Sequence, residues 1–215
     1  LLTLAMPMVK ALWSYGEAGF HSLAAAVVRE RYRREAMMGA FRILGEGQLS
    51  LTKFLLLTDQ PIDVTDIRQV LPTVLERFRP ESDLFIFSNL AMDTLDYTGP
   101  RLNEGSRGVM VGVGDAIRTL LKRFQGPLPQ PLTAAQLFCP GVLVIQGPPY
   151  QQFQDFDRVL RHPSFAEWPL IILVDDIVQA TRDVSAFLWT TFTRFEPAAD
   201  IHCGDVSVVR RHLQY

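Results

Sequence analysis

The fold is decided by the stretch "TKFLLLTDQPIDVTDIRQVLPTVLERFRPESDL", residues 52–84. It opens with an apolar run of strand length that ends at Asp59, and from Asp66 to Phe78 its apolar residues recur at helical spacing. A second apolar run, 83–89, follows directly. A strand, a helix and a strand in this order form a β-α-β unit, and such crossovers favour a parallel sheet that is buried on both sides.

The same pattern recurs without a gap in "PLIILVDDIVQATRDVSAFLWTTFTRFEPAADI", residues 169–201. Nine of the 33 aligned residues are identical, and the apolar face of the helix recurs as well. The clearest repeat is Arg-Phe-x-Pro-x-x-Asp, at 77–83 and again at 194–200. We interpret the two stretches as two similar β-α-β units that arose by duplication.

The repeated heptapeptide is typical of a helix end. An Arg suits the negative end of the helix dipole, and a Pro cannot continue the helix. The Asp can accept hydrogen bonds from the turn or pair with the Arg. A turn that ends the helix is the first interpretation, and a catalytic Arg-Asp pair is the alternative.

The rest of the chain adds further α/β elements. The pattern predicts strands at 23–28, 109–114 and 141–147, and helices at 34–44, around 115–124 and around 151–161. We therefore predict an α/β fold, with a mostly parallel sheet, helices on both faces and two similar β-α-β units. A Pro-rich linker, 126–132, divides the chain into units 1–125 and 126–215, the second packed on the same sheet or domain.

Composition excludes several classes of protein. A net charge of −2 and a pI near 6.1 give no basic surface for nucleic acid. No run approaches the roughly 20 apolar residues of a membrane span. Cys139 and Cys203 lie far apart, outside any metal-ligand spacing, which favours reduced thiols in the cytoplasm. The chain begins in mid-pattern at Leu1, so we expect a piece of a longer protein.

Few residues suggest chemistry by themselves. "GVGD", 112–115, resembles the start of a dinucleotide-binding turn but lacks the third Gly, and Asp115 as a helix N-cap is the alternative. His21 follows Glu17 by four positions, as in a metal or acid-base pair, yet no further ligand has a recognisable spacing.

Carboxylates also end two of the predicted strands. Asp59, Asp175 and Asp176 lie where α/β sheets commonly bind ligands, although helix entry and turn hydrogen bonds explain them equally well. No Gly-x-Ser-x-Gly, P-loop or His-Glu-x-x-His motif occurs.

A longer resemblance adds a function. The stretch 44–100, with "GQLSLTKF", an acidic turn with Asp-Val, a helix and R-x-x-P-x-x-D, resembles the C-terminal domain of the UbiD family of decarboxylases. The segment "AMPMVKALWSYGEAGFHSLAAAVV", 5–28, is similar to the start of that domain. Together these motifs cover about the first 110 residues.

The resemblance implies a reversible, non-oxidative decarboxylase of aromatic or α,β-unsaturated acids. Such enzymes use prenylated flavin mononucleotide (prFMN) with a divalent metal, Mn or Mg, and K. Their catalytic and metal-binding residues lie in a preceding N-terminal flavin-binding domain. We therefore expect no catalytic residue and no metal ligand in this chain, and no cofactor binding or activity by this chain alone.

The resemblance also implies the residues near the substrate. Ser50 aligns with a hydroxyl-bearing position close to the substrate, and the turn 90–96 aligns with an apolar loop over the flavin, where Met92 and Leu95 would be the contacts. The alternative is that Met92 and Leu95 simply fill the core. After "GSRG", 105–108, this chain departs from the family pattern, so the second unit is an elaboration that the resemblance does not guide.

Two hypotheses of different classes follow. The first is the substrate-side and oligomerisation domain of a UbiD-like decarboxylase in ubiquinone or menaquinone biosynthesis, which contacts the flavin-binding domain of the same protein and forms a homo-oligomer. Its aromatic acid stays open between prenylated hydroxybenzoate, a carboxylated naphthoquinol and simpler aryl acids. The second hypothesis is a free-standing, non-catalytic interaction module derived from such a domain.

Overall fold

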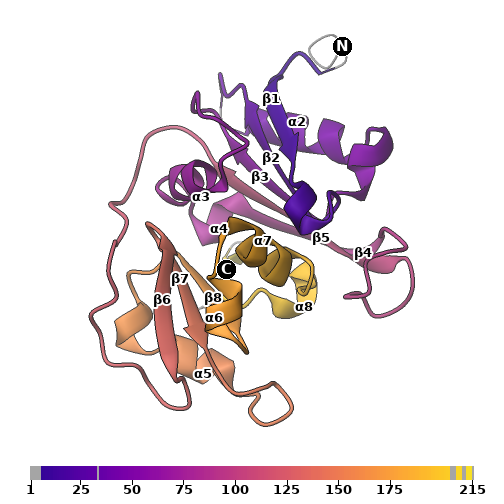
Figure 1. Cartoon of the computed structure of the whole chain (residues 1–215). Coiled ribbons are helices and arrows are strands. Elements are labelled where there is room, and N and C mark those ends of the chain that lie inside the picture. Colours follow the sequence, from indigo (N-terminus) through magenta and orange to yellow (C-terminus); the bar gives the residue numbers. More distant parts are fainter. Residues whose placement is uncertain (1–5, 33, 204–206, 210–211, 215) are drawn as a thin grey trace.

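Two mixed β-sheets with helices between them form the framework of the chain (Figure 1). The computed structural model describes residues 6–32, 34–203, 207–209 and 212–214. The first sheet has the order β1-β2-β3-β5-β4 and consists of β1 (Val9–Ser14), β2 (Leu23–Val28), β3 (Phe54–Thr58), β4 (Leu84–Ala91) and β5 (Glu104–Gly112). The second has the order β6-β7-β8 and consists of β6 (Ala134–Cys139), β7 (Val142–Gln146) and β8 (Leu170–Val174). β9 (Ser207–Val209) pairs in antiparallel orientation with β10 (His212–Gln214).

The helices lie in three layers, outside and between the sheets. They are α2 (Glu35–Leu44), α3 (Ile67–Leu75), α4 (Pro80–Asp83), α5 (Phe156–Leu160), α6 (Ile177–Ala180), α7 (Val184–Phe192) and α8 (Pro197–Asp200), with 3-10 turns η1 (Gly16–Ala18), η2 (Gly47–Leu51) and η3 (Pro163–Phe165). α3 and α7 share one core with the facing sides of both sheets, α2 covers the far side of the first sheet, and α5 and η3 cover the far side of the second.

β3 shows why an unbroken apolar run forms this sheet. Leu55 and Leu57 face α2, whereas Phe54 and Leu56 face the core between the sheets, so successive side chains are buried on opposite sides. β3 pairs in parallel with β2 and with β5. A strand covered on both faces needs apolar residues at every position.

The duplication is visible in the helices. The predicted offset carries α3 onto α7 and α4 onto α8, residue for residue. Asp66 and Asp183 cap the two longer helices, accepting bonds from the backbone N of Arg68 and Ala186. In the repeated turn, Asp83 accepts from Arg79 N at 2.9 Å and Asp200 from Glu196 N at 2.7 Å. The heptapeptide is thus a helix-ending turn in both copies.

In the first copy, the Arg and the Asp of the heptapeptide do not pair with each other, as the alternative of a catalytic Arg-Asp pair requires. Arg77 donates to the carbonyls of Thr73 and Gly114. Asp83 instead pairs with Arg34, at 2.6 Å from its Nη1.

The prediction of a mostly parallel sheet was wrong, because both sheets are mixed. β1 and β4 are antiparallel edges of the first sheet, and β6 is antiparallel to β7. α4 leads the chain to the edge of the sheet, where Leu84 pairs with Met110 in the carboxyl-terminal half of β5. β4 then runs toward the amino end of β5. Since no helix separates β4 from β5, they form an antiparallel pair rather than a parallel crossover.

The second copy differs from the first at its strands. β3 is central, but β8 is the last strand of its sheet, with a parallel partner on one side only among the described residues. The sequence pattern favoured a parallel sheet for both units, with each first strand in its interior; this expectation was wrong for β8. The second unit also builds its own sheet rather than extending the first, although one core joins the two. The division at 125/126 into domains stays a prediction.

The helix predicted around 115–124 is absent, and so is the N-cap role of Asp115. The segment instead connects β5 of the first sheet to β6 of the second without forming a helix. Leu120 packs in the shared core, and Leu121 packs against the outer core of the second sheet. Arg118 donates to the carbonyls of Leu75 and Phe78 at the end of α3. Tertiary contacts override helix propensity here. The helix predicted around 151–161 is shorter, and is α5. In the described part of the chain, no helix has the length and apolarity that crossing a bilayer requires.

Candidate functional site

β4 and β5 continue beyond the amino end of β3 as a two-stranded arm. Phe54, the first residue of β3, pairs with Gly108, but β4 and β5 stay paired from Phe87 and Arg107 to Ala91 and Glu104. Residues 92–103 connect the two strands and are called the arm loop here; they project from the body of the molecule in Figure 1. The arm loop therefore lies at the amino ends of the central strands.

A buried lysine fixes the arm loop to the sheet. Lys53, directly before β3, is only 1% exposed, and its Nζ lies 2.9 Å from Asp96 Oδ2 and 3.4 Å from Thr98 Oγ1. Burial lowers the pKa of Lys53, and the neighbouring Asp96 partly opposes this. Burial raises the pKa of Asp96, but the bonds from Lys53 and Thr98 outweigh it and lower this pKa overall. Both groups are thus held as a desolvated ion pair.

A second contact fixes the loop next to β2. His21, two residues before β2, bonds through Nδ1 to Asp93 Oδ2. This bond lowers the pKa of the Asp93 carboxyl. His21 therefore pairs with the arm loop rather than with Glu17, as the sequence spacing had suggested.

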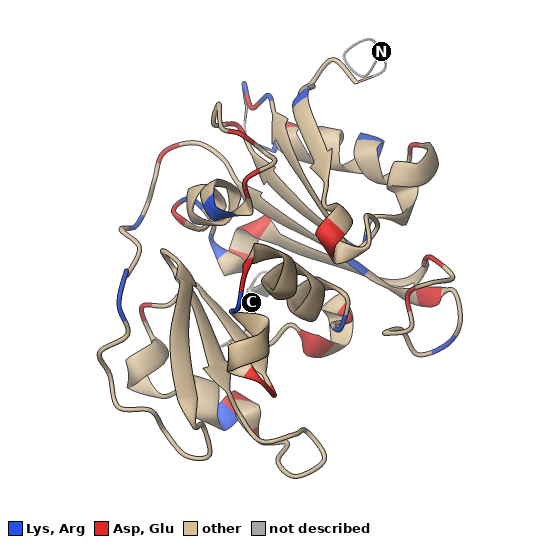
Figure 2. Cartoon of the chain, in the orientation of Figure 1, with Lys and Arg blue, Asp and Glu red and all other residues tan. Residues whose placement is uncertain are grey.

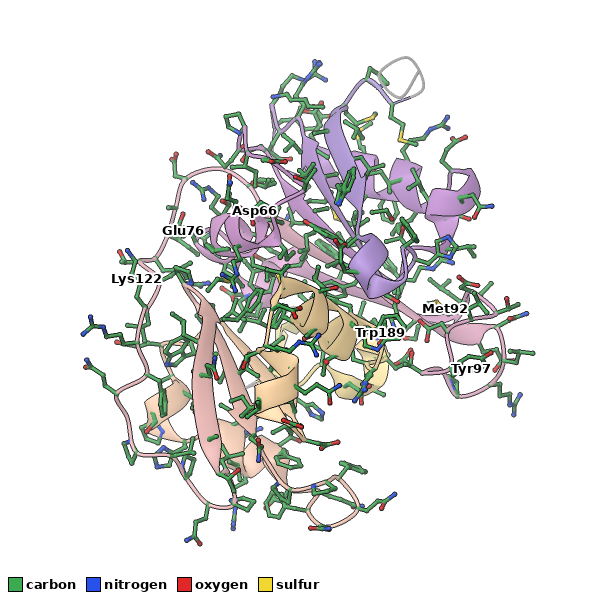
Figure 3. The ribbon with its side chains drawn as sticks, viewed as in Figure 1. Asp66, Glu76, Met92, Tyr97, Lys122 and Trp189 are labelled. Carbon is green, nitrogen blue, oxygen red and sulfur yellow. The ribbon has the colours of Figure 1, made fainter. Side chains whose placement is uncertain are left out.

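With Asp93 and Asp96 turned inward, three large apolar residues of the loop turn outward. Leu95 is 76% exposed and Tyr97 is 81% exposed, and Leu102 is exposed as well. Figure 3 shows Tyr97 at the outer end of the molecule. The two acidic anchors thus present a small apolar surface at the tip of the arm.

The three residues predicted near the substrate lie in different environments. Leu95 lies on the exposed tip, but Met92 is buried, 6% exposed, and a Cβ on Gly105 would lie 2.7 Å from its Cγ. Ser50 lies in η2 and donates its hydroxyl to Gly47 O at 2.6 Å. The structure thus places Leu95 on a surface and Met92 in the packing beneath it, while Ser50 belongs to the turn before β3.

A buried arginine supports the base of the arm. Arg107 donates to Leu44 O, at the end of α2, and to Ala91 O, at the end of β4. Burial lowers its pKa, and its Nε has no hydrogen-bond partner among the described atoms. The carbonyls at the C-terminal end of α2 carry partial negative charge that suits this cation.

A pocket of about 430 Å³ lies between the arm and α8. From the arm it is lined by Ser88, Asn89, Thr98, Pro100, Glu104 and Gly105, and from the second unit by Glu196, Ala198 and Ala199. Acidic residues gather on the arm and on α8 in Figure 2. None of the lining residues is Lys, Arg or His, so the pocket suits an uncharged or cationic group better than an anion.

The other candidate carboxylates serve the fold. Asp59 accepts from Gly114 N at 3.1 Å, and Asp176 caps α6 through Gln179 N at 3.0 Å. Both lie at the carboxyl ends of their strands, away from the arm loop, and Asp175 is exposed beside Asp176. Burial raises the pKa of Cys139 to about 12, so this thiol stays protonated at neutral pH.

Sequence reasoning missed the residues that hold the arm loop. Lys53 was recognised only as part of a motif, and Asp93 and Asp96 only as members of the turn 90–96. One signal was present: a lysine next to a strand buried on both faces is rarely left without a carboxylate. The ring of Phe195, which lies over Lys53, had no such signal because it comes from the second unit.

Comparison with known proteins identifies relatives of the whole chain. A protein of Chlamydia trachomatis serovar D, named "Uncharacterized protein", is 50% identical over 215 residues, which are 100% of this chain and 37% of that protein. A protein of Chlamydia pneumoniae, named as a subunit of 4-hydroxybenzoate decarboxylase, is 50% identical over 204 residues, 94% of this chain and 34% of that protein. The chain thus spans little more than a third of the length of these relatives.

Among solved structures, the UbiD-class enzyme HmfF from Pelotomaculum thermopropionicum in complex with FMN has a TM-score of 0.48 and 19% identity, over 60% of this chain and 28% of that chain. An evolved dimeric form of HmfF, in complex with prFMN, has a TM-score of 0.41 and 16% identity, over 59% of this chain and 25% of that chain.

A family model described as the 3-octaprenyl-4-hydroxybenzoate carboxy-lyase C-terminal domain matches residues 1–112. These residues include β1 to β5, the arm loop and both of its anchors. The chain therefore belongs to the UbiD family, and its residues 1–112 correspond to the C-terminal domain of that family.

Proposed function

We propose that this chain is the substrate-side part of a UbiD-like, non-oxidative decarboxylase of aromatic or α,β-unsaturated acids, and that the arm loop is its contact with the reacting region. One observation carries the proposal: Lys53 and His21 hold Asp96 and Asp93 inward, so that Leu95 and Tyr97 are presented outward. An exposed apolar tip held by charged contacts is typical of a surface that meets another part of the protein.

The length of the relatives supports this assignment. The chain spans 37% of the Chlamydia trachomatis protein, so a protein of that length has room for a separate catalytic region. The relative from Chlamydia pneumoniae carries the name of a 4-hydroxybenzoate decarboxylase, which favours an aryl acid as the substrate class here. By this proposal the chain forms part of a cytoplasmic homo-oligomer that acts in quinone biosynthesis.

The described residues by themselves do not fit a flavin phosphate and its metal. They contain no group of three or more His, Cys, Asp or Glu that could hold a metal ion. The pocket beside the arm loop offers carboxylates rather than the cations that a phosphate requires. We therefore assign the binding of prFMN, the divalent metal and K to the region outside this chain. In this proposal, Leu95 and Tyr97 only form part of the apolar wall of the substrate site.

The experiment is an assay on a protein of the relatives' full length that carries this chain, prepared in cells that supply prFMN. CO₂ release is measured with 4-hydroxybenzoate and with related aryl acids. Release from at least one acid, reduced in a folded Leu95→Asp variant, supports the proposal. A protein that holds prFMN but releases no CO₂ from any acid would favour the non-catalytic interaction module instead.

A further inference from the structure

The ring of Phe195 lies over the ammonium of Lys53. Lys53 Nζ is 5.3 Å from the centroid of this ring. The ring is itself fixed by edge-on contacts with Phe54, at 5.6 Å, and with Phe192, at 5.9 Å. A residue of the second unit thus covers the ion pair that holds the arm loop of the first.

The backbone that carries Phe195 is bound to the arm. Ala198 N donates to Ser106 Oγ of β5 at 2.8 Å. Glu196 is 7% exposed, accepts from Ala199 N at 2.8 Å, and lines the pocket beside the arm loop. The start of α8 is therefore docked on β5, and Phe195 has a defined position.

The internal repeat shows that this placement is particular to the second copy. Phe78, the equivalent residue of the first copy, is fully buried in the core between the sheets. Phe195 packs against the edge of the same core, is only partly buried, and lies over Lys53. Phe195 also falls outside residues 1–112, so the ring that covers Lys53 comes from beyond the family domain.

Two consequences of a covering ring are relevant to the ion pair. A ring face attracts a cation, and this attraction is larger when the cation is desolvated. The ring also excludes water from Lys53 and Asp96, which strengthens their mutual attraction. The lowered pKa of Lys53, caused first by burial, agrees with a desolvated ammonium.

We propose that Phe195 is a positioning residue for the arm loop, which it holds through Lys53 and Asp96. The second unit is then part of the functional site, since it keeps Leu95 and Tyr97 in place. The effect on catalysis rests on the proposed function, but the ordering of the arm loop does not.

The test is amide hydrogen exchange of residues 92–103, measured by mass spectrometry on the full-length protein. Phe195→Ala should speed exchange in the arm loop by roughly 2- to 30-fold, the range that a cation–ring contact supports. Phe195→Tyr keeps a ring and should restore slow exchange. Phe195→Leu keeps most of the volume without the ring, and replaces the Ala variant if that variant does not fold.

Phe153→Ala is the matched control. Phe153 is also a partly buried ring of the second unit, and it packs edge-on against Phe156 at 4.9 Å in the outer core of the second sheet. Its removal should leave exchange in the arm loop unchanged. Equal acceleration by Phe153→Ala, or unchanged exchange in folded Phe195→Ala and Phe195→Leu variants, would overturn the proposal.

Kinetics separate this inference from the proposed function. If the full-length protein releases CO₂, Phe195→Ala should raise KM more than it lowers kcat, because it disorders a wall rather than the reacting groups. If no acid reacts, the decarboxylase proposal fails while the exchange result still decides the role of Phe195.

Discussion

The ammonium of Lys53 and the carboxylate of Asp96 lie 2.9 Å apart, with side chains that are 1% and 10% exposed. Lys53 stands directly before a central strand and Asp96 lies in the loop at the end of the arm. This ion pair links the central sheet to the part of the chain that we assign to the substrate. A buried pair of this kind specifies a geometry more than it adds stability.

Breaking the pair from one side should be costly. Lys53→Met leaves Asp96 without its cation and should lower the free energy of unfolding by about 3–5 kcal/mol. Asp96→Leu in the same background removes the unpaired charge and should recover much of the loss. Urea denaturation at neutral pH is measured for Lys53→Met, for Asp96→Leu alone and for the double variant. If the double variant loses the sum of the two single losses, the pair is not coupled as described.

Stability should depend on pH through the loop anchors. His21 lowers the pKa of Asp93, and for Asp96 the bonds from Lys53 and Thr98 outweigh the effect of burial and lower its pKa. Each carboxylate therefore stabilises the fold fully above the unfolded pKa of about 3.9, and this contribution is lost as the pH falls through the lower folded pKa. The urea midpoint is measured from about pH 6 downward for the wild type and for the double variant Asp93→Asn/Asp96→Asn. Below about pH 4, the midpoint of the double variant should fall less steeply than that of the wild type. Parallel curves would exclude these two groups as the cause.

The repeated turn offers a matched comparison within one chain. Asp200 is exposed and accepts from Glu196 N, so Asp200→Ala should cost about 1 kcal/mol, as for a lost cap. Asp83 is buried and accepts from Arg79 N and from Arg34, so Asp83→Ala should cost about 2–4 kcal/mol. Thermal and urea denaturation measure both. Equal losses would mean that the contact with Arg34 contributes nothing.

Much of the fold could be predicted from periodicity, and the exceptions have physical causes. The strand predicted at 23–28 is β2, and the offset between the two units is reproduced by α3 and α7. Strand direction was not predictable in the same way, because the apolar run 83–89 indicates a strand but not how the chain connects it to its neighbours. β4 is a partly exposed edge strand, and the connection without a helix makes it antiparallel to β5. One missed signal was Pro140-Gly141 between β6 and β7, since Pro followed by Gly with a positive φ is typical of a tight hairpin turn.

The site was harder to predict than the fold. The family motif led to the turn 90–96, where the structure finds the anchors Asp93 and Asp96. Periodicity gives no information about which side chains of a loop turn inward. Contacts such as Phe195 over Lys53 join residues from two units, and no local pattern encodes them.

Leu95 and Met92 should respond differently to enlargement. Leu95→Phe changes an exposed side chain, so it should change the melting temperature no more than a typical surface substitution does. Met92→Phe overpacks a buried position and should cost about 1–3 kcal/mol. In the full-length enzyme, Leu95→Phe should reduce kcat/KM about 10-fold on the bulkiest aryl acid and much less on the smallest. Equal effects on both acids would remove Leu95 from the substrate wall.

The central claim is that the anchored arm loop is the substrate-side surface of a decarboxylase. Its most direct test is the rate of CO₂ release by the full-length protein, with prFMN occupancy verified by absorbance, for the wild type and for the folded variant Leu95→Asp. We predict release from at least one aryl acid by the wild type and a loss of about 10-fold or more in the variant, because a charge placed in an apolar wall must be desolvated. Equal rates in the two proteins, or no release by the prFMN-loaded wild type, would contradict the claim.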